Sequence, residues 1–179
     1  QPYFLGPGEG WAAFYGSANT QDPAPQIKQV VGQAFAPHLA GPWRRAEADH
    51  KLPCNLSALS DKIEQPMVTK LRDGSFVAFF DALGHEMSGD IGYSWSPDGH
   101  AWDPTCSQLL NVSDGADWIA ASGRHRTRTP QGAIELPDGS LLVSFSGFDL
   151  SPLTNPQHES IGFARLKFQT SSGSVQQRN

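Results

Sequence analysis

Residues 64–82 read EQPMVTKLRDGSFVAFFDA, and this stretch decides the fold. A proline opens a short apolar run, the pair Asp73-Gly74 interrupts it, and a second run rich in aromatic and β-branched residues follows. Asp-Gly between two apolar runs predicts a β-hairpin, because both residues accept the positive φ of a tight turn. A proline is tolerated at the first position of a strand, where no ladder N–H is needed.

The same pattern occurs three times along the chain. Pro2, Pro66 and Pro130 are each 64 residues apart, and each opens a segment of similar composition. The other two segments are QPYFLGPGEGWAAFYGSA from Gln1 and RTPQGAIELPDGSLLVSFSGF from Arg128. A constant period indicates a protein built from structural repeats.

Each hairpin is followed by a second repeated element, in which an apolar residue, a glycine, any residue and Ala or Ser succeed one another. The three copies are VGQA at 31–34, IGYS at 91–94 and IGFA at 161–164. In the first two copies a turn leads to Trp43 or Trp102, which is expected to begin a fourth strand. About four strands in roughly 60 residues predict the blade of a β-propeller. We expect Trp11, Trp43 and Trp102 to pack between blades.

The predicted fold is all-β, an incomplete β-propeller of about three four-stranded blades. It spans 1–168, with repeat units at about 1–50, 62–110 and 126–168, and a polar tail follows at 169–179. A β-sandwich of hairpins is the alternative, against which the constant offset argues. Propellers have about four to eight blades. We therefore expect a fragment, whose missing blades belong to the same protein and whose open ends expose apolar faces.

Composition narrows the range of partners. The net charge of −5 disfavours nucleic acid and anionic membranes. No apolar run approaches the ~20 residues of a membrane span. No metal-binding, phosphate-loop or nucleophile-elbow motif occurs, and we expect no metal and no cofactor.

Cysteines and sequons bear on the cellular location. Cys54 and Cys106 fit either one disulfide or two separate thiols. The triplets at 55–57 and 111–113 are acceptor sequons for N-glycosylation. They favour an extracellular or secreted protein.

The repeat places candidate site residues together. In a propeller the innermost strand of each blade lines the central channel, so the residues just before the repeated prolines converge at one mouth. These are Gln1, Glu64 with Gln65, and Arg128 with Thr129. A partly enclosed carboxyl has the raised pKa that a general acid requires, and an arginine opposes that rise or orients a substrate hydroxyl. Without the repeat, Glu64 would read as a surface residue.

Two further residues are predicted to bind substrate. The second strands of the hairpins return to the same mouth, and Asp81 is the charged residue among their ends. Its alternative role is to start a turn. Trp118, in the loop 117–126, offers a ring that stacks on a sugar; the alternative is an ordinary surface loop.

The chain resembles a known superfamily in the strings IEQPMV, RDGSFVAFFD, IGYSWSPDGHAWDP and RTPQGAIELPDGSLLVSFSGFD. They are similar to the five-bladed propeller glycosidases, which include arabinanases, β-xylosidases, invertases and levansucrases. The resemblance covers about Pro2 to Phe168. In such enzymes a Glu-x-Pro at a blade start resembles the general acid that protonates the departing sugar oxygen, and this residue is Glu64 here. The resemblance implies a glycoside hydrolase with an oligo- or polysaccharide substrate.

The chain departs from that superfamily at the other carboxylates. The resemblance implies one aspartate at the start of the first blade, as base or nucleophile, and another at the start of the second, which tunes the acid. If the three units are blades two to four, the first lies upstream of Gln1, and the second falls near Gln1 itself. We therefore expect 1–179 alone to be inactive. The alternative is a non-catalytic carbohydrate-binding or scaffold propeller. A single carboxylate leaves inverting and retaining mechanisms open.

Overall fold

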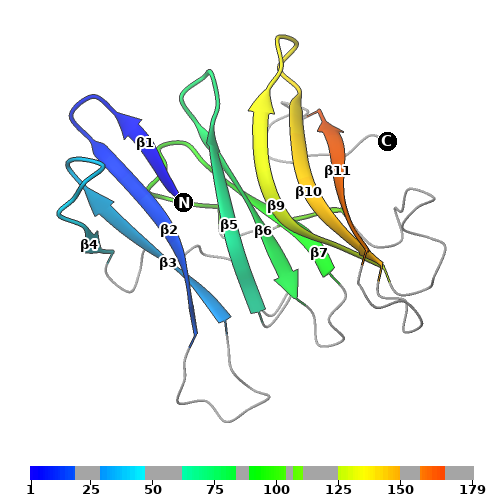
Figure 1. Cartoon of the computed structure of the whole chain (residues 1–179). Coiled ribbons are helices and arrows are strands. Elements are labelled where there is room, and N and C mark those ends of the chain that lie inside the picture. The colour runs from blue at the N-terminus through cyan, green and yellow to red at the C-terminus, as the bar shows by residue number, and fades with distance from the viewer. Residues whose placement is uncertain are drawn as a thin grey trace.

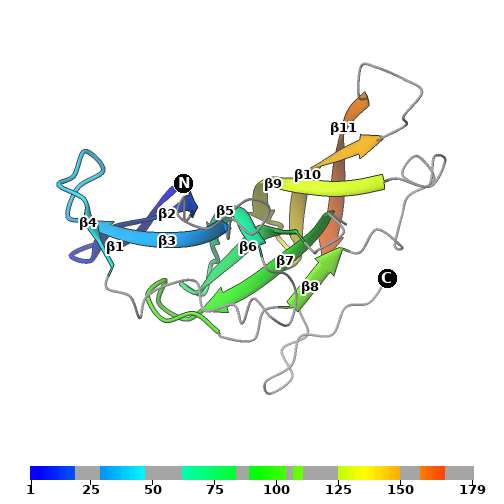
Figure 2. The same ribbon diagram turned by 90° about the horizontal axis from the view of Figure 1, so that it is seen from below.

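The computed structural model describes residues 1–18, 29–46, 62–83, 89–103, 107–110, 125–149 and 158–167. The elements in these ranges are all β-strands, and they form three antiparallel sheets that lie side by side in a row (Figures 1 and 2). We call the sheets blades 1, 2 and 3. The all-β prediction is confirmed. The described part of the chain holds no helix that could cross a membrane.

Each blade is a meander, in which every strand pairs with the next one along the chain. Blade 1 comprises β1 (Pro2–Gly6), β2 (Gly10–Ala18), β3 (Gln29–Ala36) and β4 (Arg44–Arg45). Blade 2 comprises β5 (Lys62–Lys70), β6 (Phe76–Leu83), β7 (Gly89–Ser96) and β8 (Ser107–Leu110). Blade 3 comprises β9 (His125–Glu135), β10 (Leu141–Asp149) and β11 (His158–Leu166).

The Asp-Gly pairs form the predicted hairpin turns, but with a different geometry. Only the glycine has a positive φ, 92° at Gly74 and 80° at Gly139. The aspartate instead accepts hydrogen bonds from the serine two residues on. Asp73 Oδ1 accepts from Ser75 N at 2.9 Å and from Ser75 Oγ at 2.6 Å, and the β9–β10 turn repeats both bonds. The aspartate is needed for its side chain and not for a left-handed backbone.

Two of the three repeated prolines lie inside strands and do not open them. Pro2 begins β1, as predicted, but β5 begins at Lys62 and β9 at His125, upstream of Pro66 and Pro130. Both internal prolines are buried. A proline inside a strand removes a ladder hydrogen bond, so the strand needs a local irregularity to accommodate it.

A β-bulge supplies that irregularity. The β5–β6 register shifts between Glu64 and Met67, and the β9–β10 register shifts around Pro130. The residue before each internal proline has a left-handed backbone, with φ of 52° at Gln65 and 53° at Thr129. The bulge lets the strand continue on both sides of the proline.

The repeated glycine of each blade's third strand lies under an aromatic ring of the second strand. The three pairs are Tyr15 over Gly32, Phe80 over Gly92 and Phe145 over Gly162. A Cβ at Gly92 would stand 2.4 Å from Phe80 Cε2, closer than real Cβ atoms stand to a neighbour. The three aromatic residues recur at intervals of 65 residues. The glycine of the sequence motif therefore makes room for a ring.

An apolar core joins blades 1 and 2. It includes Tyr3 and Phe14 from blade 1 and Phe80 and Trp102 from blade 2. The rings of Phe14 and Trp102 meet edge to face with centroids 5.2 Å apart. Tyr3 Oη donates to the carbonyl of Gly99 at 3.0 Å, so the core also contains a polar link across the junction.

A second apolar core joins blades 2 and 3. It packs Val77 and Phe79 against Leu141 and Val143, all of them almost fully buried. Full burial of side chains of this size stabilises a fold by about 1.5–3 kcal/mol each. Each blade is therefore held mainly by its neighbour.

The two tryptophans of the repeat differ in environment. Trp102 is 6% exposed and packs against blade 1, as predicted, whereas Trp43 is 38% exposed. Trp43 directly precedes β4, which begins at Arg44. Trp102 follows the bend at 97–101 and lies outside the described strands, because β8 begins at Ser107, so the expectation that it opens the fourth strand is wrong.

Candidate functional site

The first strands of blades 2 and 3 run in the same direction. In Figure 1 the hairpin turns of all three blades point upward, and β5 and β9 begin at the lower edge. Glu64 is the third residue of β5 and Arg128 the fourth of β9. Each is followed by the left-handed residue and the buried proline. The backbone therefore gives Glu64 and Arg128 the same place in neighbouring blades.

The second strands return to these positions. Glu64 lies directly opposite Asp81 in the β5–β6 pair, and Arg128 lies opposite Ser146 in the β9–β10 pair. Two acidic residues thus occupy facing positions in blade 2.

Asp81 is fully buried. It lies inside β6, so it does not start a turn, and none of its surface is exposed. Its Oδ1 accepts a hydrogen bond from the backbone N–H of Thr129 in blade 3. Burying a carboxylate costs several kcal/mol unless hydrogen bonds stabilise it. A bond from an N–H group to an ionised carboxylate is among the strong ones.

Thr129 needs such a partner. A β-branched residue with positive φ is an outlier, and its backbone costs about 1–3 kcal/mol. That conformation persists only where the surroundings hold it, and such residues cluster at functional sites. The hydrogen bond to Asp81 stabilises Thr129 in this state.

Gln65 occupies the same position in blade 2. Its side chain is exposed. The neighbouring blade contacts this strand through Gln1, whose Oε1 accepts from Val68 N at 3.1 Å. Blade 1 therefore reaches the first strand of blade 2 close to Gln65.

Several predicted residues lie outside the described ranges. They are Trp118, both cysteines and both glycosylation sequons. Among the residues that the structure does describe, no group of three or more His, Cys, Asp or Glu side chains could hold a metal ion.

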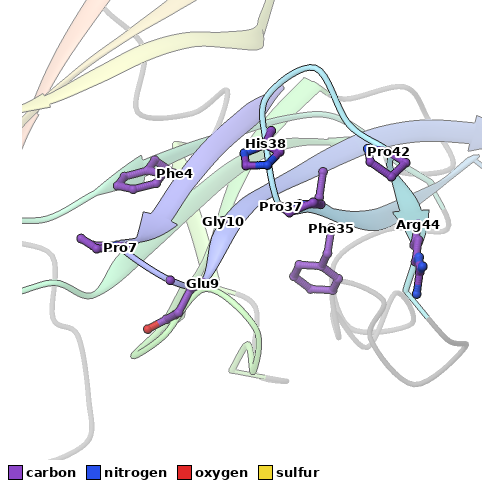
Figure 3. Close-up of a pocket in the computed structure, with 12 residues that line it drawn as sticks. Phe4, Pro7, Glu9, Gly10, Phe35, Pro37, His38, Pro42 and Arg44 are labelled. Carbon is purple, nitrogen blue, oxygen red and sulfur yellow. The ribbon is translucent and has the colours of Figure 1, made fainter.

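A hollow of about 710 Å³ lies away from the predicted mouth (Figure 3). It opens at the hairpin-turn end of blade 1. Phe4, Pro7 and Glu9 line it from the β1–β2 side, and His38 and Pro42 from the β3–β4 turn. Sequence reasoning did not anticipate it, because it depends on how two turns approach each other.

The hydrogen bond between Asp81 and Thr129 was also missed. The sequence contained one signal for it, since Asp81 stands in the continuous run FVAFFDAL. A strand apolar on both faces is buried on both faces. An acidic residue inside it is therefore expected to meet a hydrogen-bond donor of a neighbouring element.

Comparisons with known proteins find no similar sequence but do find similar structures. No protein-family model matches the sequence, and a search of curated proteins finds no relative. Two solved structures are similar. A GH32 β-fructofuranosidase of Bombyx mori, BmSUC1, aligns with a TM-score of 0.59 at 17% identity over 95% of this chain. A thermostable family-43 glycoside hydrolase aligns with a TM-score of 0.58 at 13% identity over 89% of this chain.

The chain therefore shares the β-propeller fold of these two structures. The chain spans 34% of the first neighbour and 47% of the second. The predicted propeller is confirmed over the β-sandwich, and the three sheets are blades of such a propeller. At these identities the likeness concerns the propeller fold alone.

Proposed function

We propose that the chain belongs to a glycoside hydrolase that cleaves glycosidic bonds of oligo- or polysaccharides, with Glu64 as its general acid. One observation carries the proposal. Glu64 and Arg128 hold equivalent positions in neighbouring blades, and each precedes a strained residue and a buried proline. Strain repeated at one level of two blades favours a functional mouth over an ordinary strand start.

In the proposed reaction the Glu64 carboxyl gives its proton to the glycosidic oxygen as the carbon–oxygen bond breaks. A water molecule or a second carboxylate attacks the sugar carbon. We assign the substrate contacts to Arg128, Gln65, Thr129 and Trp118. Asp81, which was also predicted to bind substrate, has no exposed surface to offer a sugar. Asp81 therefore acts from beneath the surface of the mouth, without touching the substrate.

We also propose that further blades of the same protein cover the outer faces of blades 1 and 3. Trp102 is buried by blade 1, whereas Trp43, which follows the equivalent turn, is exposed, as is Phe4 of the same blade. On blade 3, Ile161 and Phe163 are 63% and 66% exposed. The equivalent residues of blade 2, Ile91 and Tyr93, are buried against blade 3. By analogy with blade 2, another blade of this kind is the partner favoured for the exposed faces of blades 1 and 3.

The test of the acid is Glu64→Gln in the full-length protein. Hydrolysis of a natural glycan should fall about 10²–10⁴-fold, as expected for loss of a general acid. The loss should be smaller on aryl glycosides, whose leaving groups need little protonation. The matched control is Glu9→Gln, since Glu9 is exposed at the hairpin-turn end, and this variant should keep full activity. An active parent that tolerates Glu64→Gln on both substrates excludes Glu64 as the acid.

A carbohydrate-binding or scaffold propeller is the second candidate. It is favoured by Asp81, which lies opposite Glu64 but has no exposed surface, so it cannot act on a sugar as the second carboxylate. Calorimetric titration with oligosaccharides separates the two functions, because this candidate predicts binding without any turnover by the full-length protein.

A further inference from the structure

We propose that Asp81 is a positioning residue, whose buried carboxylate holds the left-handed backbone of Thr129 and so sets Arg128 relative to Glu64. The inference rests on the proposed function, which places Glu64 and Arg128 at one mouth.

Asp81 connects the two strands that carry these residues. On its own blade it lies directly opposite Glu64 in the β5–β6 pair. Across the junction its Oδ1 accepts from the N–H of Thr129, the residue next to Arg128. A shift of Asp81 would therefore move the β9 backbone relative to β5.

Other links between these blades lie further from the mouth. Thr69 Oγ1 donates to the carbonyl of Ala133 at 3.2 Å, midway along the strands. Near the hairpin turns, Arg72 Nη2 donates to the carbonyl of Glu135 at 3.1 Å. Asp81 makes the corresponding link at the level of the proposed site.

The link is not a general property of the repeat. The residue equivalent to Asp81 is Gly16 in blade 1, which has no side chain to accept a hydrogen bond. Gln65 nevertheless adopts the same φ as Thr129. Both residues are strained there, but the cost is greater for Thr129, whose Cβ is branched, than for the unbranched Gln65. The strained Thr129 of blade 3 therefore requires a stabilising hydrogen bond, which Asp81 provides.

The first experiment needs no activity and follows amide hydrogen exchange at Thr129 in the full-length protein. Asp81→Ala should speed exchange there by about tenfold or more, because the acceptor is lost. Asp81→Asn should keep it slow, because an amide oxygen still accepts. The matched control is Thr69→Val, which removes the link between the same blades midway along the strands and should leave Thr129 unchanged. Unchanged exchange in Asp81→Ala would overturn the proposal.

The second experiment is a double-mutant cycle on glycan hydrolysis. Asp81→Ala should lower kcat by about 100-fold with little change in KM, as a small misplacement of a catalytic group does. Thr129→Gly alone removes a proposed substrate contact and should raise KM, but its backbone is relieved because glycine adopts this φ without strain. The double variant Asp81→Ala/Thr129→Gly should have a kcat at least about tenfold higher than that of Asp81→Ala. A double variant no better than Asp81→Ala would show that Asp81 acts otherwise.

A replacement variant and a separate readout distinguish failure of the role of Asp81 from failure of folding or of the proposed function. If Asp81→Ala does not fold, Asp81→Ser replaces it with the same expectations, because blade 3 carries serine at this position and its hydroxyl is too short to reach. A parent that hydrolyses no glycan defeats the proposed function. The exchange at Thr129 still decides whether Asp81 holds that backbone.

Discussion

At the scale of single residues, each blade has a glycine that lies under an aromatic ring of the neighbouring strand. The ring of the neighbouring strand occupies the space where a side chain would begin, at Gly32, Gly92 and Gly162. The glycine leaves room for that ring because it has no Cβ. Cross-strand pairs of this kind are the units that stabilise a sheet.

Gly92→Ala should therefore destabilise the fold. Its Cβ would meet the ring of Phe80, which is fully buried and has no free space to move into. We expect a loss of about 1–3 kcal/mol in the free energy of unfolding, measured by urea denaturation. Gly132→Ala is the control, because its Cβ would lie 3.5 Å from Ser144 Oγ, an ordinary contact. Equal unfolding midpoints for the two variants would contradict this account.

At the scale of elements, the hairpin turns depend on an aspartate side chain. In the β9–β10 turn, Asp138 Oδ1 accepts from the hydroxyl of Ser140 at 2.6 Å. Arg165 of β11 donates to Asp138 Oδ2 at 2.6 Å and to Ser140 Oγ at 2.9 Å. The bond from the Ser140 hydroxyl, followed by the Ser140 N–H and the Arg165 charge, lowers the pKa of Asp138 to about 2.

This turn predicts a dependence of stability on pH. Because the folded pKa of Asp138 is below its ordinary value, its contribution is complete above a pH of about 4 and is lost as the pH falls towards about 2. The thermal midpoint of Asp138→Asn should therefore fall less than that of the parent between these values. Glu9→Gln removes one exposed carboxylate elsewhere and should follow the parent. Parallel curves for the parent and Asp138→Asn would refute the assignment.

The sequence predicted the hairpins better than the bulges, for a physical reason. An Asp-Gly turn forms from local contacts, so a pair such as Asp73 and Gly74 between two apolar runs is enough to predict it. The left-handed Thr129 is stabilised by Asp81, 48 residues away in another blade. No pattern within one strand contains that contact. The positions of Glu64 and Arg128 followed from the repeat, whereas their strained neighbours did not.

At the scale of the whole molecule, position in the row of blades decides which residues are buried. Trp43 and Trp102 follow similar turns in successive repeats, and the sequence predicted packing for both. Only Trp102 has a blade against its ring in the described structure, with Phe14 as its partner. The repeat alone gives the order of the blades, but burial depends on what stands next to each of them.

The two tryptophans should accordingly differ on substitution. In the 179-residue chain, Trp102→Ala should cost about 3–5 kcal/mol of unfolding free energy, the usual value for a buried tryptophan. Trp43→Ala should cost about 1 kcal/mol or less. Chemical denaturation measures both. Similar losses would mean that the outer face of blade 1 is already covered, for example by self-association, which analytical ultracentrifugation would reveal.

The rings over the three glycines also provide a spectroscopic reporter. A proton above or below an aromatic face is shielded by the ring current, so one α-proton of Gly32, Gly92 and Gly162 should resonate far upfield of an ordinary glycine. Tyr15, Phe80 and Phe145 each lie against a glycine of their own blade. The three resonances would therefore follow the blades separately. Their order of disappearance on heating would show whether the propeller melts as one unit or blade by blade.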